Sequence, residues 1–311
     1  MGGRRTERVL LLVTIDTECD HDPSWVRSKP LSFRSVVEGV PDRLQPVFCD
    51  VGAVPTYLLT VEVLEDRESV DVLRQLQGPF EFGTHLHSAF VDPEKKFHDY
   101  AGVDSPDFQC HCRPEVEYQK LNNLTRAFES CFGYRPASFR AGRFGAGPNT
   151  IASLERLGYS VDTSVTPHML WRHPDGDVDY RAAPGQPYFP SRGSIVRAGN
   201  GNAHRVLEIP VTMKRRWFRG PRWFRPWFSS VDGMKNVVRD QLARFGERRV
   251  LVLNMMFHSM EIIPKASPYP QTEEDVRRFL DDLSSVLYWC AGEGVEFASA
   301  ASVYPVFAGQ G

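Results

Sequence analysis

The sequence predicts an α/β fold, either a (β/α) barrel or an open doubly wound parallel sheet. Short continuous apolar runs recur along the chain, as is typical of strands buried on both faces. Helical patterns lie between most of these runs. The chain has 311 residues, an ordinary length for one α/β domain, so we expect a single domain over residues 1–311.

Eight apolar runs are predicted strands. They are Val9–Ile15, Val54–Leu59, Phe80–His85, Ser138–Ala141, Tyr159–Asp162, Val206–Val211, Val250–Met256 and Val295–Ala298. Predicted helices cover Glu62–Gln77, Glu115–Cys131, Asn149–Leu157 and Thr272–Cys290, the last beginning with a capping-box pattern at Thr272 and Asp275. Asp42–Asp50 is a weaker helix prediction because it contains Pro46. Residues 166–203 are rich in Pro and Gly without a period, which predicts a long irregular excursion.

The N-terminus carries arginines before the apolar run Val9–Val13, which resembles a signal peptide but is shorter than the roughly 7–15 apolar residues of one. No stretch approaches the roughly 18 apolar residues of a membrane span. We therefore expect a cytoplasmic protein, with peripheral contact to the inner membrane as an option. Its six cysteines are expected to be mostly reduced thiols. The net charge of −2 argues against a nucleic-acid partner.

Ionisable residues collect where the predicted strands end, in "TIDTE", "GTHLHS", "FRAGRFG", "VDTS" and "NMMFHS". In parallel α/β folds these ends meet on one face, where function concentrates. The residues are Asp16, Glu18, His85, His87, Arg140, Asp162 and His258. Each alone also fits a structural role: a helix cap, a turn, a structural ion pair or a hydrogen-bonded core histidine.

Together these residues supply the parts of a metal-assisted hydrolase. One carboxylate and two neutral imidazoles make a three-ligand site with a position open for water. A second carboxylate can accept the proton of that water, and an arginine can keep the carboxylate ionised. A histidine from another strand can protonate the leaving group.

The order of these motifs resembles the polysaccharide deacetylase family, the NodB-homology group or carbohydrate esterase family four. The resemblance runs from about Val9 to Ser299, and "YLLTVEVLED" and "MMFHSMEIIP" are similar to a branch linked to lipopolysaccharide or surface-polysaccharide biosynthesis. It implies a distorted (β/α) barrel of about seven units. It also implies a divalent metal, zinc first and cobalt or nickel as alternatives.

The resemblance implies a role for each motif. Asp16 is the expected base, Arg140 its orienting partner and His258 the acid. Glu18, His85 and His87 are the expected metal ligands. Arg143, Phe144, Asp162, Trp217 and Trp223 are the expected substrate-binding residues.

Two motifs depart from the family pattern. "DTE" replaces the usual pair of adjacent acids, and the two histidines are two residues apart instead of four. His111, His21 or Asp20 therefore remain alternatives to His87 as the third ligand. A metal site in "CHC", Cys110–Cys112, is disfavoured because adjacent ligands strain a tetrahedral ion.

In Lys214–Phe228, "KRRWFRGPRWFRPWF", cations and aromatic residues interleave. This composition fits a packed loop, a platform for a sugar or glycolipid, or contact with a membrane surface. The expected function is removal of an N-acetyl group from a sugar of a bacterial surface polysaccharide or its precursor. In one version of this hypothesis, the N-acetylated sugar is linked to a lipid or a nucleotide. The alternatives are a metal-dependent amidohydrolase acting on a non-sugar amide and a non-catalytic carbohydrate-binding relative.

Overall fold

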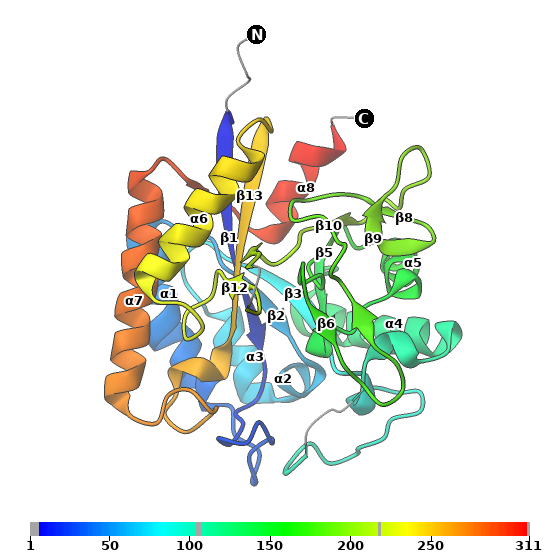
Figure 1. The fold of residues 1–311 in the computed structure, drawn as a ribbon. Helices are drawn as coiled ribbons and strands as arrows, with labels where there is room; N and C mark the ends of the chain where they lie inside the picture. The colour runs from blue at the N-terminus through cyan, green and yellow to red at the C-terminus, as the bar shows by residue number, and fades with distance from the viewer. Residues whose placement is uncertain (1–5, 104–106, 217–218, 310–311) are drawn as a thin grey trace.

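The computed structural model describes residues 6–103, 107–216 and 219–309. Its centre is a curled sheet with the strand order β10–β5–β4–β3–β2–β1–β13, and β14 pairs with β1 (Figure 1). Every pairing in this sheet is parallel. The strands are β1 (Arg8–Thr17), β2 (Thr56–Leu59), β3 (Glu81–Leu86), β4 (Ser138–Ala141), β5 (Val161–Asp162), β10 (Leu207–Glu208), β13 (Val250–His258) and β14 (Glu296–Phe297).

Each of the eight predicted strands overlaps one strand of this sheet, which confirms the distorted (β/α) barrel. The two longest strands, β1 and β13, are buried along most of their length and pair from Arg8 with Val250 to Asp16 with His258. Continuous burial explains why their sequences are apolar without alternation.

The two edges of the sheet meet just after β10. The amide of Thr212 donates to the carbonyl of Asn254 on β13 (3.0 Å), and the amide of Asn254 donates to Oγ1 of Thr212 (2.8 Å). The side-chain amide of Asn254 also donates to the carbonyl of Ile209 (3.1 Å). These bonds close the barrel where the strand order has no direct pairing between β10 and β13 within the described residues.

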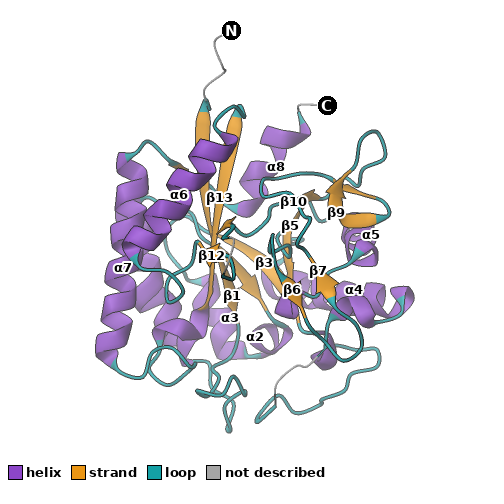
Figure 2. Ribbon diagram, in the orientation of Figure 1, coloured by secondary structure: helices purple, strands orange, loops and turns teal. Residues whose placement is uncertain are grey.

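Helices cover the outside of the sheet, with α1, α6 and α7 on one side and α4 and α5 on the other (Figures 1 and 2). The helices are α1 (Gln45–Val51), α2 (Val61–Glu65), α3 (Arg67–Arg74), α4 (Pro114–Phe132), α5 (Pro148–Leu157), α6 (Val231–Phe245), α7 (Glu273–Gly292) and α8 (Ala300–Ala308), with a π-helix, η1, at Ser35–Leu44. Short 3-10 turns are η2 (Ser88–Phe90), η3 (Gln109–His111), η4 (Gly142–Phe144) and η5 (Ser259–Ile262). None of the helices in the described part of the chain combines the length and apolar character of a membrane span.

The predicted capping box of α7 is confirmed, because Oγ1 of Thr272 accepts from the amide of Asp275 and Oδ2 of Asp275 accepts from the amide of Thr272. The predicted helix Glu62–Gln77 is divided at Asp66, whose carboxylate caps α3 by accepting from the amide of Ser69 (2.8 Å). The weaker helix prediction, Asp42–Asp50, is helical across the junction of η1 and α1, with Pro46 in the first turn of α1.

Helices α6 and α8 were not predicted. The buried positions Met234, Val237, Val238 and Gln241 give α6 a helical period, but its polar Gln241 interrupts the apolar pattern. The excursion at 166–203 forms two small hairpins, β6 (Leu170–Trp171) with β7 (Val178–Asp179) and β8 (Pro190–Ser191) with β9 (Ser194–Ala198). A third hairpin pairs β11 (Met213–Lys214) with β12 (Arg222–Trp223).

Candidate metal and catalytic centre

The carboxyl ends of four parallel strands bring the predicted site residues together. In the sheet register Asp16 of β1 lies opposite His258 of β13, and His85 of β3 lies opposite Arg140 of β4. His87 follows two residues after His85 and so projects to the same side. The expectation that these strand ends share one face of the barrel is met.

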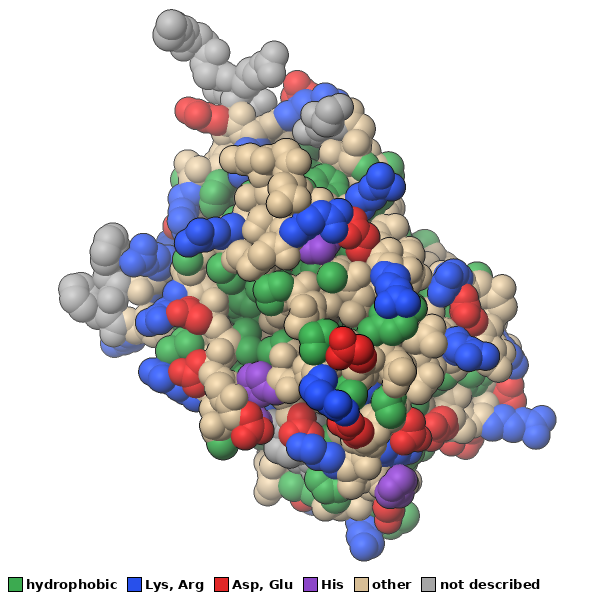
Figure 3. Space-filling view, turned by 90° about the vertical axis from the view of Figure 1, so that its right-hand side faces the viewer, with side chains coloured by type: hydrophobic (Ala, Val, Ile, Leu, Met, Phe, Trp, Pro, Cys, Tyr) green, Lys and Arg blue, Asp and Glu red, His purple; other side chains and the backbone are tan. Residues whose placement is uncertain are grey.

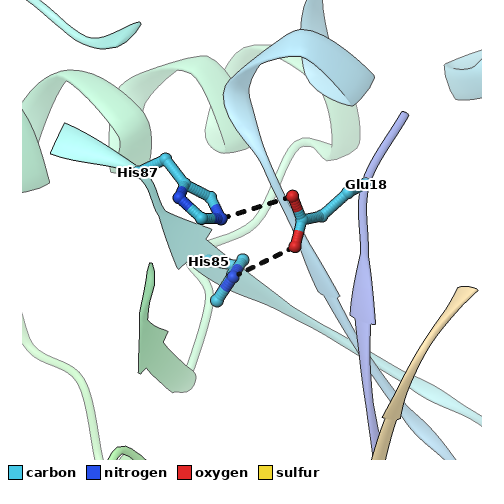
Figure 4. Close-up of side chains that lie close together, drawn as sticks. All are labelled: Glu18, His85 and His87. Atoms are coloured by element: carbon cyan, nitrogen blue, oxygen red, sulfur yellow. Dashed lines mark ion pairs between the residues drawn. The ribbon is translucent and has the colours of Figure 1, made fainter. Parts of the chain in front are cut away.

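Glu18, His85 and His87 form a buried three-residue cluster whose ligand atoms all lie within 4.8 Å of one another (Figure 4). Oε1 of Glu18 is 3.5 Å from Nε2 of His85, and Oε2 is 3.3 Å from Nε2 of His87. Nδ1 of His85 is 3.0 Å from the carbonyl oxygen of Arg140. That carbonyl accepts the Nδ1 proton, so Nε2, which faces Glu18, is the nitrogen of His85 that can bind a metal.

The electrostatics of this cluster fit a divalent cation. Burial alone would raise the pKa of the Glu18 carboxyl, but the neighbouring His87 and His85 outweigh it and hold that pKa well below its usual range. Burial lowers the pKa of His85, whereas Asp16 and Glu18 raise it, and the net pKa is raised. Neither ring nitrogen of His87 has a hydrogen-bond partner among the described residues. An anionic carboxylate and two imidazoles are a donor set that binds such ions.

Asp16 lies beside this cluster and is held by Arg140. Nη1 of Arg140 donates to Oδ1 of Asp16 (2.6 Å), and its other nitrogens donate to Oγ1 of Thr14 (2.5 Å) and to the carbonyl of Thr163 (3.0 Å). Burial would raise the pKa of Asp16, but the charge of Arg140, followed by His85 and His258, keeps it below the ordinary value. Asp16 is therefore an ionised carboxylate with a fixed orientation, as a general base requires.

His258 lies across Asp16 from His85, with its Nε2 atom 3.8 Å from Oδ2 of Asp16. Its Nδ1 atom is 2.7 Å from Oε1 of Glu261, which also accepts from the buried guanidinium of Arg225. Glu261 and Arg225 were not among the residues predicted from the sequence. The spacing His258–Glu261 was visible, but nothing in the sequence indicated that Arg225, from a distant loop, would reach them.

No family model and no curated protein matches the sequence. Solved structures do match over nearly the whole chain. A protein assigned as a polysaccharide deacetylase from Mycobacterium smegmatis superposes with a TM-score of 0.55 at 15% identity, covering 99% of this chain and 92% of its own. A second, from Pseudomonas aeruginosa, gives 0.56 at 13% identity, covering 98% and 92%. The chain has the polysaccharide deacetylase fold. Puue allantoinase, with 0.57 at 15% identity and coverage of 98% and 91%, has it too.

In this deacetylase fold the site residues line a cavity of about 300 Å³. Its walls are Asp16, Glu18, His21, Trp25, His85, His87, Arg143, Phe144 and His258. Trp25 was not predicted. Its ring lies 5.2 Å from the ring of His258 and 5.9 Å from that of His21, so it forms an apolar wall beside the expected acid.

The expected substrate-binding residues fall in different places. Arg143 and Phe144, both with positive φ, line the cavity. Trp223 is buried behind Phe144, with ring centroids 6.0 Å apart, and does not line the cavity. Asp162 is fully buried below the site, where Ser164 donates to it (2.6 Å), so it is not placed to contact a substrate. Trp217 lies outside the described residues.

The alternative ligands do not join the Glu18 cluster. His111 belongs to a separate, more exposed group with His173 and Asp175. Asp20 accepts from the amides of Arg34 and Ser35 at the start of η1. His21 lines the cavity, and burial lowers its pKa to about 4. The six cysteines, including Cys110 and Cys112, are free thiols.

The segment 214–228 is packed into the deacetylase fold through its second half. Phe224 and Arg225 are buried, and Trp227 stacks on Tyr269 (5.9 Å) and Phe279 (5.4 Å). Trp223 and Trp227 therefore pack within the protein, as the packed-loop interpretation of this segment predicts. The segment instead delivers Arg225 to Glu261 and His258.

Proposed function

We propose that this protein is a metal-dependent hydrolase that removes an N-acetyl group from a sugar of a bacterial surface polysaccharide or its precursor. One observation carries the proposal. The same cavity of about 300 Å³ is lined by three kinds of group: the candidate metal ligands, the Asp16 carboxylate held by Arg140, and the His258 imidazole held by Glu261. A protein that only binds sugars needs no such set of base, orienting arginine and acid.

Glu18, His85 and His87 would hold the metal. Zinc suits one carboxylate and two imidazoles, and cobalt or nickel would fit the same donors. When bound, such an ion supplies Lewis acidity, which polarises the acetyl carbonyl and makes water more acidic. Arg27 stands behind the cluster, with Nη2 3.6 Å from Oε2 of Glu18 and 3.5 Å from Oε1 of Glu62. The Arg27 guanidinium balances part of the negative charge of Glu18 and Glu62. It also holds the Glu18 side chain, which is one methylene longer than the aspartate of the family pattern, in place.

Asp16 accepts the proton of the attacking water. The bond from Arg140 fixes one carboxylate oxygen, so that the other, Oδ2, is directed toward His85 and His258. Water adds to the acetyl carbon, and the carbon–nitrogen bond then breaks, which gives acetate and a sugar amine.

His258 gives its Nε2 proton to the departing nitrogen. Glu261 holds Nδ1 of His258 and so directs Nε2 into the cavity, while Arg225 fixes Glu261 from behind. Help of this kind is worth about 100- to 10,000-fold in rate. Trp25 covers His258 and excludes water from one side of it.

Hydrolysis of a non-sugar amide is the second candidate function, since the allantoinase has the same fold. The two candidates share the site, so only substrate tests separate them. Acetate release from N-acetylated oligosaccharides and formation of the ring-opened acid from cyclic amides should be measured side by side.

The first test is metal content, measured by plasma mass spectrometry on the purified chain before and after incubation with zinc, cobalt and nickel. We expect about one ion per chain, lost in Glu18→Ala, His85→Ala and His87→Ala. His98→Ala, a change at an exposed histidine, is the matched control. A wild-type chain that binds none of the three ions and releases no acetate would favour the non-catalytic sugar-binding alternative.

A further inference from the structure

A strongly cationic pocket lies between the β6–β7 and β11–β12 hairpins. It has a volume of about 270 Å³, and His168, Arg181, Arg215, Arg216 and Arg219 line it. None of the described residues that line it is acidic. The whole chain has a net charge of −2, so this density of arginines is a local feature. Lys and Arg side chains also gather along the left edge of Figure 3, the side that faces the viewer in Figure 1.

Acids in the described part of the chain pair with some of the cations in and around the pocket. Arg181 is paired with Asp179 through two bonds of 2.9 and 2.6 Å. Asp240 is shared between Lys214 (3.5 Å) and Arg244 (3.8 Å). The β11–β12 loop brings three more arginines, Arg215, Arg216 and Arg219, to the lining of the pocket.

The positive charge around the pocket affects the pKa of the His168 imidazole. Burial is the main cause that lowers its pKa, and the charges of Arg244 and Arg215 lower it further. His168 is therefore a neutral hydrogen-bonding group at neutral pH, between permanently charged guanidinium groups.

Aromatic rings connect the two hairpins that border this pocket with the catalytic cavity. Phe144, which lines the cavity, stacks on Trp171 with centroids 5.4 Å apart and an angle of 17°. The ring of Trp171 lies 6.3 Å from that of Trp223. Trp171 follows three residues after His168, and Trp223 belongs to β12, which begins right after the loop that carries Arg219. The hairpins that border the pocket therefore also carry the two tryptophan rings that pack behind Phe144 at the catalytic cavity.

We propose that this arginine pocket binds a phosphate or pyrophosphate group carried by the substrate, while the N-acetyl sugar occupies the catalytic cavity. The inference rests on the proposed deacetylase function for the sugar end. Guanidinium groups bind phosphate oxygens with paired, charge-assisted hydrogen bonds, and aromatic side chains offer apolar faces to a sugar ring. A neutral polysaccharide would leave the arginines unused. The substrate class is therefore a phosphorylated sugar, either a soluble sugar phosphate or a sugar joined to a lipid through phosphate.

Binding is tested without catalysis, by titration calorimetry of the full chain with inorganic pyrophosphate. We expect binding that weakens as salt is added and that falls by about tenfold or more in the double variant Arg215→Gln/Arg219→Gln. The control is Arg67→Gln, which removes an arginine with a 96% exposed side chain from α3 and should not change the affinity. Absence of pyrophosphate binding, or equal binding by the double variant, would overturn the proposal.

Two further ligands separate the sources of the phosphate. N-acetylglucosamine 1-phosphate represents the soluble source, and phosphatidylcholine vesicles containing phosphatidic acid represent the lipid source, with pure phosphatidylcholine as the blank. If the double variant loses binding to one of these ligands, the pocket is a phosphate site and that ligand identifies the source of the phosphate. If the double variant binds both ligands as the wild type does, the proposal is refuted. Because these readouts need no turnover, they do not depend on whether acetate release is found. If the protein deacetylates neutral sugars but does not bind pyrophosphate, the phosphate-site proposal is wrong and the proposed deacetylase function stands.

Discussion

Nδ1 of His258 lies 2.7 Å from Oε1 of Glu261, three residues further along the chain in the turn η5. The same oxygen accepts from the guanidinium of Arg225, which belongs to a loop more than thirty residues away in sequence. This relationship fixes which nitrogen of His258 faces the cavity. It also ties the expected acid to a buried ion pair.

Glu261→Gln should therefore reduce catalysis without removing the metal. The change removes the charge that holds Nδ1 of His258 and leaves buried Arg225 without its anion, 3.2 Å from that nitrogen. We expect kcat for acetate release to fall by roughly 100-fold, the lower range of a general acid's contribution. Nitrogen NMR of His258 should show a changed tautomer balance.

Glu274→Gln is the control for this change, because Glu274 lies on α7 with a 69% exposed side chain. His258→Ala should lower kcat at least as strongly, with metal content near that of the wild type. An unaltered kcat in Glu261→Gln would exclude a positioning role for this carboxylate.

Arg27→Met should destabilise the protein. The guanidinium of Arg27 is buried between Glu18 and Glu62 and lies 4.0 Å over the ring of Phe90. Removing it leaves Glu62 as a buried carboxylate without a cation, which costs about 3–5 kcal/mol of unfolding free energy. Urea unfolding measures this loss.

The double variant Arg27→Met/Glu62→Gln should recover a large part of that stability, since it buries no uncompensated charge at position 62. Equal stability of the single and double variants would show that Glu62 does not respond to the charge of Arg27.

Gly142→Ala should weaken metal binding by acting on His87. A Cβ atom at position 142 would lie 2.6 Å from the carbonyl oxygen of Leu86 and 2.8 Å from Nδ1 of His87, closer than real contacts allow. The His87 ring must then move away, and we expect zinc affinity to fall by about tenfold. Competition with a chromophoric chelator measures this affinity.

Gly193→Ala is the matched control, because nothing lies within 4 Å of a Cβ atom built there. If Gly142→Ala retained full zinc affinity, the position of His87 would not depend on this close approach.

Glu117→Gln should remove part of the pH dependence of stability. Glu117 is buried on α4, where it accepts from Thr150 and from Gln109 (3.1 Å), and burial raises its pKa to about 7. Since the folded pKa exceeds the unfolded value, the stability from its proton is complete below about pH 4.5 and is lost as pH rises toward 7. The loss amounts to roughly 3 kcal/mol at 1.36 kcal/mol per pH unit.

Urea unfolding of wild type and variant at several pH values between these limits isolates this contribution. The wild type should lose stability relative to Glu117→Gln as pH rises, whereas Glu115→Gln, an exposed change on the same helix, should follow the wild type. Parallel curves for the wild type and Glu117→Gln would contradict the raised pKa.

Much of the site could be predicted from sequence because strand ends are local features. Asp16, His85 and His258 each end an apolar run, and parallel pairing carries such ends to one face. The two-residue spacing of His85 and His87 follows the alternation of side chains along a strand. Asp162 also ends a predicted strand, yet its carboxylate lies fully buried beside Glu208, which in turn accepts from the amide of Val165 (3.1 Å).

The sequence by itself determined the order of the sheet strands along the chain and the residues at their ends, because burial on both faces requires continuous apolar runs. Only the tertiary structure decided what loops contribute. Arg225 reaches Glu261, Trp25 covers His258 and Arg27 supports Glu18 because the loops that carry them pack against the barrel. Such contacts depend on long-range packing between loops and the barrel. They produce no periodic pattern in the sequence, so they could not be predicted from it.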